Sequence, residues 1–261
     1  MGLFHQGLTG ILPVSNFDEV RAFYEDRLGL VKTQEWTDRE GNRRARYSVT
    51  GGGFIELHEN DRTLPQGPTS FWMEAADING LYSALQKIGG MDLFDPIEDK
   101  YFHARSFQMR DPAGNATFVV AYEKNVRPYT KDSVKGAFFK DEFRTVLFVD
   151  DLDATYDFYT TVLEMPCVYQ WNECPGDKGF KYHAAGTEAY IENLHRIPLT
   201  KQGFATIKLY AVDFDACYEK LSANPKAHMI RPMYINELGA REFTLEDPDG
   251  NYILICESES E

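Results

Sequence analysis

The sequence predicts an α+β protein made of two tandem modules, each a pair of βαβββ-like units. The first observation is a repeated turn, D-P-x-G-N, which occurs in RDPAGNATFVV at 110–120 and in EDPDGNYILIC at 246–256. The second is that the chain aligns with itself over most of its length. The third is that strand-like and helix-like segments follow one another in the same order in both copies.

The self-alignment indicates a duplication. Matched residues of the two copies first differ by 135 in number. The second copy then has one extra residue in the turn TGGGF/AGTEAY, and from there matched residues differ by 136. Matched positions of identical type include Tyr24 with Tyr159, Trp36 with Trp171, Tyr47 with Tyr182, Glu56 with Glu192, Asp77 with Asp213, and Arg105 with Arg241. A register with a single slip indicates two copies of one module. We therefore predict module 1 over 1–125, a polar linker over 126–137 and module 2 over 138–261.

Each copy begins with a strand, at 8–14 and 144–149, that runs into a helix capped near Asn16 or Asp151. Two or three strands follow, separated by Gly-rich turns such as DREGN at 38–42 and CPGDKG at 174–179. A further strand, at 69–75 and 205–211, leads through Asp77 or Asp213 into a second helix.

The D-P-x-G-N turn closes the last hairpin of each copy. Asp-Pro starts a tight turn, Gly supplies a positive φ, and Asn tolerates such a φ or bonds to its own backbone. Apolar and β-branched residues on both sides complete the hairpin signal.

Composition excludes several classes of protein. The net charge is −14 and the pI about 4.9, which argues against nucleic acid because phosphates would be repelled. No apolar run approaches ~18 residues and the start lacks a signal-peptide pattern, so we expect no membrane span. The four cysteines form no C-x-x-C pair, which favours reduced thiols in a cytoplasmic protein.

The segments ILPVSNFDEVRAFYEDRLGL, VLFVDDLDATYDFYTTVLEM and AREFTLEDPDGN resemble the vicinal oxygen chelate superfamily. This is the fold of glyoxalase I, extradiol dioxygenases, fosfomycin-inactivating enzymes and bleomycin-resistance proteins. The resemblance covers nearly the whole chain, twice. It implies that each module forms an open, cupped mixed sheet with helices on the outside and a site on the concave face. It does not specify an activity.

The resemblance also implies where a divalent metal would be held in catalytic members, by His, Glu or Gln at three positions in each copy. Here those positions hold Thr9, Ser70 and Phe118 in copy one, and Arg144, Thr206 and Leu254 in copy two. Phe and Leu cannot ligate, and an arginine repels a cation. We therefore expect no metal and no other cofactor.

Strand alternation supplies the first candidate ligand contacts, since residues two apart share a face of a sheet. Trp72 shares a face with Ser70, and Lys208 and Tyr210 share one with Thr206. Arg144 and Lys208 could point into one cavity and bind an anion. Alternatively, Arg144 pairs with a structural carboxylate such as Glu192, or the assumed alternation is shifted by one residue.

Matched aromatic and basic residues supply the others. Trp36, Trp171, Tyr47 and Tyr182 could stack on a flat ligand, although repetition in both copies also fits core packing. Trp72 has no aromatic counterpart in copy two, which favours a specific role. Arg105 and Arg241 precede the last hairpin by equal distances, which also suits a salt bridge of the fold.

These observations favour a metal-free protein that sequesters a small aromatic or polar molecule, as the bleomycin-resistance branch does. The alternative is a glyoxalase-like lyase, isomerase or dioxygenase with an atypical site, in which Glu56 or Glu192 could act as a general base. A third hypothesis is an accessory domain for a protein partner. Because two modules can pair within one chain, we expect a monomer or a homodimer.

Overall fold

The structure is a computed structural model of the chain. It describes residues 3–4, 7–67, 69–89, 92–100, 104–122, 139–174, 177–184, 189–195 and 204–257. The predicted linker at 126–137 lies outside these residues. No helix among them is long and apolar enough to cross a membrane. Among the side chains that the structure describes, Cys167, Cys217 and Cys256 have free thiols.

Four βαβββ units follow one another along the chain. Unit 1 contains β1 (Thr9–Val14), α1 (Phe17–Ala22), a π-helical turn (Phe23–Arg27), β2 (Val31–Thr37), β3 (Arg43–Ser48) and β4 (Phe54–Glu59). Unit 2 contains β5 (Ser70–Ala75), α2 (Ile78–Ile88), β6 (Asp92–Lys100), β7 (Ala104–Arg110) and β8 (Ala116–Tyr122).

The second copy repeats this order. Unit 3 contains β9 (Phe139–Val149), α3 (Leu152–Asp157), a π-helical turn (Phe158–Val162), β10 (Cys167–Cys174), β11 (Asp177–His183) and β12 (Ala189–His195). Unit 4 contains β13 (Thr206–Ala211), α4 (Phe214–Ala223), β14 (His228–Ile235), β15 (Arg241–Glu246) and β16 (Tyr252–Glu257).

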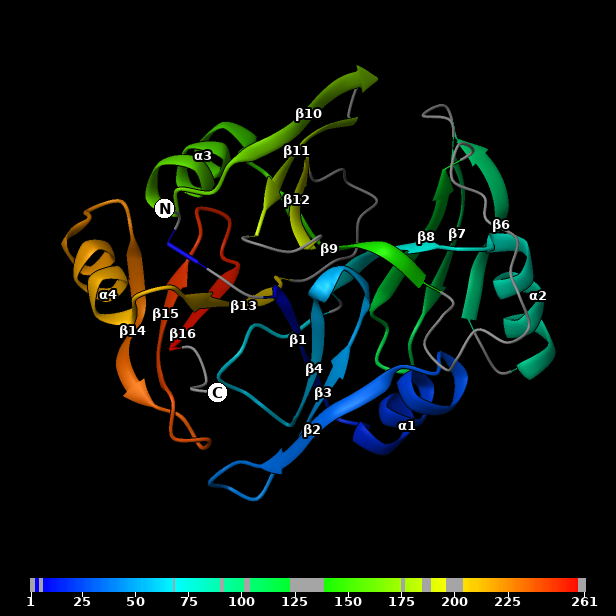
Figure 1. The fold of residues 1–261 in the computed structure, drawn as a ribbon, viewed down its shortest axis with the longest axis horizontal. Coiled ribbons are helices and arrows are strands. Elements are labelled where there is room, and N and C mark those ends of the chain that lie inside the picture. Colours follow the sequence, from blue (N-terminus) through cyan, green and yellow to red (C-terminus); the bar gives the residue numbers. More distant parts are fainter. Residues whose placement is uncertain are drawn as a thin grey trace.

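The four units form two eight-stranded sheets, and the predicted α+β class with open sheets is confirmed (Figure 1). Sheet A has the order β14-β15-β16-β13-β1-β4-β3-β2, so it combines unit 1 with unit 4. Sheet B has the order β10-β11-β12-β9-β5-β8-β7-β6, so it combines unit 2 with unit 3. The expectation that each module forms its own sheet is therefore corrected. The first strand of each unit has a free edge, and the first strand of any other unit can pair with it. Sequence periodicity does not specify which unit does so.

Within each sheet, the two units join through their central strands. Strand β1 pairs antiparallel with β13, and β5 pairs antiparallel with β9. Phe71 on β5 and Phe143 on β9 stack with ring centroids 5.5 Å apart, at the boundary with sheet A. A Cβ at Gly10 would lie 2.4 Å from the Phe71 ring, and one at Gly53 would lie 2.4 Å from the Phe143 ring. These two glycines let the sheets approach closely.

Helices lie at the outside of both sheets, and their first residues follow the predicted caps (Figure 1). The side chains of Asp77, Asp151 and Asp213 each accept hydrogen bonds from backbone N–H groups of the first helical turn. Asn16 occupies the N-cap of α1 without such a bond, and its side chain donates to Glu19 instead.

The repeated D-P-x-G-N turn ties the two sheets together. Asp111 accepts hydrogen bonds from the backbone of Ala113 and from the backbone and side chain of Asn115. It also accepts one from the hydroxyl of Tyr24, 3.1 Å away, on the π-helical turn of unit 1. Asn115 in turn accepts from the backbone N–H of Thr69. The turn therefore links unit 2 in sheet B to unit 1 in sheet A.

Copy two repeats the same arrangement. Asp247 accepts from the Tyr159 hydroxyl at 3.3 Å and from the backbone and side chain of Asn251. Asn251 accepts from the backbone N–H of Ala205. The two turns, 136 positions apart in sequence, thus make equivalent bridges between the sheets.

We expect Tyr159→Phe to lower the free energy of unfolding by about 1 kcal/mol, because Asp247 loses one hydrogen bond while the ring stays in place. Urea denaturation with an unchanged m-value measures the effect. Tyr218→Phe is the matched control, because the Tyr218 hydroxyl has no hydrogen-bond partner among the described residues. Equal losses in both variants would contradict the bridging role.

Candidate active site

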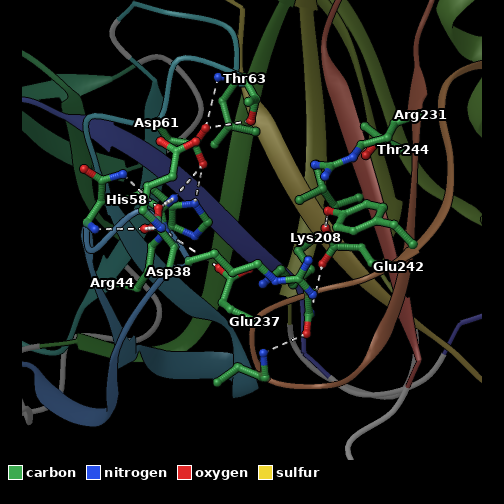
Figure 2. Close-up of a pocket in the computed structure, with 18 of the residues that line it drawn as sticks. Asp38, Arg44, His58, Asp61, Thr63, Lys208, Arg231, Glu237, Glu242 and Thr244 are labelled. Carbon is green, nitrogen blue, oxygen red and sulfur yellow. Dashed lines mark hydrogen bonds and ion pairs between the residues drawn. The ribbon is translucent and has the colours of Figure 1, made fainter.

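Sheet A holds a cavity of about 1200 Å³ on its concave face. Its walls come from both ends of the chain, since unit 1 supplies one side and unit 4 the other. Figure 2 shows Asp38, Arg44, His58 and Asp61 grouped on the unit 1 side, and Lys208 between this group and Arg231, Thr244 and Glu242 of unit 4. The volume slightly exceeds the range of ~300–1,000 Å³ that is typical of small-molecule sites.

A buried carboxylate lies under the floor of this cavity. Glu56 on β4 is 0% exposed and contacts three basic side chains. Arg46 Nε lies 2.7 Å from Glu56 Oε1, and Lys208 Nζ lies 2.8 Å from Oε2. His58 Nε2 lies 3.0 Å from the same Oε2. Lys208 belongs to unit 4, so this ion pair joins the two halves of sheet A.

The charges of this cluster are mutually stabilised. Burial opposes ionisation of Glu56, but Lys208, His58 and Arg46 outweigh it and hold the pKa of the carboxyl well below its usual value. Burial likewise opposes the charge of Lys208, yet Glu56 raises the pKa of its ammonium above the usual value. Both groups are therefore charged at neutral pH.

On the unit 1 side, a second network surrounds Arg44. Its Nη2 lies 2.7 Å from Asp38 Oδ2 and 3.1 Å from Asp61 Oδ2. Asp61 also lies 3.2 Å from His58 Nδ1, which connects this network to Glu56. A hydrogen bond from the Thr63 hydroxyl to Asp61 fixes the loop that follows β4.

On the unit 4 side, Glu242 is the buried carboxylate. It accepts hydrogen bonds from the Tyr234 hydroxyl and, at 2.7 Å, from the thiol of Cys256. Burial raises the pKa of the Cys256 thiol well above its usual value, so the thiol keeps the proton that it donates.

The two sides meet at the rim. Arg39 donates a 3.0 Å hydrogen bond to the backbone oxygen of Ile235, and Arg44 Nε lies 3.9 Å from Glu237. Figure 1 shows the turns after β2 and β14 side by side at this point.

Sheet B places an equivalent carboxylate in a different setting. Glu192 on β12 forms an ion pair with Arg144 on β9, as one of the sequence alternatives proposed. The guanidinium also lies 4.5 Å above the ring of Trp72 and donates to the Tyr122 hydroxyl at 3.0 Å. Arg144 and Lys208 therefore lie in different sheets, and the predicted anion site between them is wrong. The prediction correctly placed Arg144 and Lys208 on concave faces, but it assigned both to the concave face of a single sheet.

The tryptophans lie at concave faces. Trp36 on β2 lines the sheet A cavity, with Arg46 6.0 Å from its ring centroid. Trp171 stacks on Tyr169 in sheet B, 5.8 Å away. Trp72 stacks on Phe118, beside Arg144. Tyr210 accepts a 2.7 Å hydrogen bond from Arg46 at the floor of sheet A.

Tyr47 and Tyr182 do not contact the cavity, which corrects their prediction as ligand contacts. Both are 0% exposed, and they stack on Tyr24 and Tyr159 respectively. Because Arg46 points to the concave face, strand alternation directs Tyr47 to the helix side.

Arg105 and Arg241 also lie on the helix side, in a contact that all four units share. A basic residue of the third strand of each unit reaches the first turn of that unit's first helix. The pairs are Arg43 with Asp18 at 2.8 Å, Arg105 with Asn79 at 2.9 Å, Lys178 with Asp153 at 3.3 Å, and Arg241 with Asp215 at 2.6 Å. Repetition in every unit supports the structural alternative rather than ligand contact.

The donor set does not fit the metal that the fold implies. In sheet A, Thr9 on β1 is opposite Lys208 on β13, Thr206 is opposite Ile11, and Leu254 on β16 lies beside Lys208. The Lys208 ammonium forms an ion pair with Glu56, and its positive charge would repel a metal ion. Among the described residues no group of three His, Cys, Asp or Glu side chains could hold a metal.

Sequence reasoning missed four side chains that line the cavity, namely Arg44, His58, Arg231 and Glu242, and Arg46, which pairs with Glu56 beneath it. A signal was present, because Arg44 and Arg46 are two apart on one strand and Glu56 and His58 are two apart on the next. Two adjacent strands with charged residues on the same face indicate a polar concave surface.

Comparison with known proteins supports the architecture. The model of the Glyoxalase/Bleomycin resistance protein/Dioxygenase superfamily matches residues 5–117 and 143–255. Glyoxalase I from Zea mays has a TM-score of 0.72 at 15% identity, covering 97% of this chain and 92% of that one. A putative dioxygenase from Bacillus subtilis subsp. subtilis str. 168 has a TM-score of 0.69 at 14% identity, covering 99% and 86%.

A third structure, the cppA protein from Streptococcus pneumoniae TIGR4, has a TM-score of 0.52 at 10% identity and covers 98% of this chain and 99% of that one. At these identities the likeness shows the fold alone. No curated protein matches the sequence.

We expect Glu56→Gln to lower the free energy of unfolding at pH 7 by about 3 kcal/mol, because it removes the buried negative charge that pairs with Lys208 and Arg46. The folded-state pKa of Glu56 is depressed, so its stabilisation is present above about pH 4.5 and is lost as pH falls through the folded pKa. The difference between wild type and variant should therefore narrow below about pH 4.5.

Urea denaturation from pH 7 to pH 3 measures this difference. Glu98→Gln is the control, because Glu98 pairs with Lys100 at an exposed position and its loss should leave stability nearly unchanged. A gap between wild type and Glu56→Gln that stays constant over the whole pH range would refute the assignment.

Proposed function

The chain belongs to the Glyoxalase/Bleomycin resistance protein/Dioxygenase superfamily, and we propose that it binds a small polar molecule in the sheet A cavity without a metal ion. One observation carries this proposal. The buried ion pair of Glu56 with Lys208 lies at the cavity floor, beside Thr9 and Leu254, which occupy positions where the fold implies His, Glu or Gln ligands. The Lys208 ammonium therefore supplies the positive charge at the cavity floor.

The lining supports a polar ligand. Among the residues that the structure describes, five acidic and five basic side chains other than His58 line the cavity: Asp38, Glu40, Asp61, Glu237 and Glu242, with Arg39, Arg44, Arg62, Lys208 and Arg231. This balance favours a ligand without a large net charge, because a surplus of either sign would be repelled by half of the lining. Among the described residues of the lining, three are aromatic, so stacking on a flat ligand is a minor contribution.

Binding is favoured over the enzymatic alternative. A general base needs a pKa near the working pH. Three basic side chains hold the pKa of Glu56 well below its usual value, and Glu192 is ion-paired with Arg144. Neither carboxylate suits the role that the sequence suggested for it. The activity of glyoxalase I belongs to that protein, and the likeness to it supports the cup but not its chemistry.

We expect less than about 0.1 metal ion per chain after the tag-free protein is dialysed against Ni²⁺, Zn²⁺, Mn²⁺ and Fe²⁺ in turn and then desalted, because affinity depends on ligand number and type. Inductively coupled plasma mass spectrometry gives the count. About one tightly held metal per chain would overturn the metal-free proposal and restore the enzyme hypothesis.

We expect Thr244→Trp to weaken the binding of cavity ligands by at least about tenfold, because an indole at the floor would fill part of the space that a ligand needs. Ligands are first found with wild type in a metabolite panel, by thermal shift and calorimetry. Gln108→Trp is the matched control, since residue 108 is the equivalent position in sheet B, opposite Phe118 as Thr244 is opposite Leu254. Ligands that bind the Thr244→Trp variant as tightly as the wild type bind elsewhere. A panel in which Thr244→Trp weakens no ligand would count against the site.

A further inference from the structure

We propose that the ligand of this cavity carries a carboxylate group and that Arg231 and Thr244 bind it, with Lys208 as a further cation in the same row across sheet A. This inference rests on the proposed function and names the class of ligand. It starts from a row of side chains that crosses the concave face of sheet A. Figure 2 shows Arg231 and Thr244 beside each other on the unit 4 side of the cavity.

The strand register places this row directly. Arg231 on β14 is opposite Thr244 on β15, and Thr244 is opposite Leu254 on β16. Leu254 is opposite Lys208 on β13. All four line the cavity. Neighbouring strands are ~4.8 Å apart, so two cations flank a hydroxyl and an apolar side chain over three strand spacings.

Arg231 is the one charged member of the row that has no counter-ion. Its guanidinium carbon lies 3.4 Å from the ring centroid of Tyr234, and it forms no ion pair or hydrogen bond with another described residue. The hydroxyl of Tyr234 is bonded to Glu242, which holds the ring under the guanidinium. A guanidinium stacked in this way keeps its N–H groups in the plane of the fork free for an acceptor.

Thr244 provides the second donor. Its side chain is 5% exposed, lines the cavity and has no hydrogen-bond partner among the described residues. A nearly buried hydroxyl without a partner is costly unless a ligand or water satisfies it. Because Thr244 is the direct neighbour of Arg231, one acceptor group can contact both.

The surrounding charges favour a carboxylate over a dianion. Glu242 lies two residues before Thr244 on β15 and faces the same side, and Glu56 already offsets Lys208. A second negative charge on the ligand would therefore be repelled by Glu242, and the row offers no second cation without a counter-ion to offset that repulsion. A planar monoanion matches the guanidinium fork with two parallel hydrogen bonds.

An apolar surface next to the row indicates the body of the ligand. Leu254 and Leu64 pack with Ile11 and Tyr252 in a small cluster separate from the main core. Leu254, Leu64 and Tyr252 line the cavity. A monocarboxylic acid with an apolar body of moderate size would place its carboxylate at Arg231 and its body over this cluster.

The test compares acids with their primary amides, which have nearly the same shape but no charge. The probes are 4-phenylbutyrate, cyclohexylacetate and hexanoate, each with its amide, and calorimetry measures binding to the full chain. We expect at least one acid to bind at least about tenfold more tightly than its amide. Arg231→Met should weaken that acid by about tenfold, leave the amide unchanged and so remove the preference.

Two further variants sharpen the result. Thr244→Val, which keeps the shape of the side chain, should weaken the acid by several-fold. Arg110→Met, an exposed arginine of sheet B, makes the same change in net charge and should leave binding unchanged. An equal effect of Arg110→Met would mean that only the overall charge matters and would overturn the inference.

The experiments can refute the carboxylate site and the binding cavity separately. Equal affinities for acid and amide, both lost in Thr244→Trp, would overturn the carboxylate site and leave the binding cavity standing. Failure of every acid to bind while other ligands of the metabolite panel remain sensitive to Thr244→Trp would have the same meaning. Absence of any ligand sensitive to Thr244→Trp would overturn both.

Discussion

A carboxylate buried on the concave face of each sheet must be neutralised, and the arrangement of both cups follows from that requirement. Glu56 and Glu192 occupy matched positions on the fourth strand of their units, and neither is more than 2% exposed. An ionised carboxylate without a partner in such a place costs several kcal/mol. Sheet A supplies Lys208 from the opposite unit together with Arg46, whereas sheet B supplies Arg144 from the same unit.

The choice of cation decides what each cup can hold. Arg144 lies against Trp72, so an aromatic ring covers the ion pair of sheet B. The position in sheet A that matches Trp72 is Lys208 itself, whose extended side chain reaches Glu56 and leaves the floor open. The duplication thus preserved the carboxylates and exchanged their partners. An open polar cavity in sheet A is the consequence.

The sequence predicts the duplication, the units and the face on which most side chains lie, because these depend on local periodicity. The helix caps at Asp77, Asp151 and Asp213 and the shared face of Thr206, Lys208 and Tyr210 follow from the same rule. Which units share a sheet is a long-range choice between equivalent edges, and no local pattern decides it. For that reason Arg144 and Lys208 were expected in one cavity. Tyr47 is wrongly predicted because an aromatic residue present in both copies suits the concave face or the helix face of the sheet equally well. The direction of a neighbour such as Arg46 is needed to choose between the two faces.

The pairing of the first unit with the last has a further consequence for how the site forms. The Glu56–Lys208 ion pair joins residues 152 apart, and the Arg39–Ile235 hydrogen bond at the rim joins residues 196 apart. Closing loops of such length costs chain entropy before these contacts can stabilise the fold. Neither module contains a complete cup, since each contributes one unit to sheet A and one to sheet B. The Tyr24–Asp111 and Tyr159–Asp247 bridges connect units within a module across the two sheets. They therefore hold the sheets in the relative position in which unit 4 can bring Lys208, Thr244 and Arg231 to the cavity that unit 1 begins.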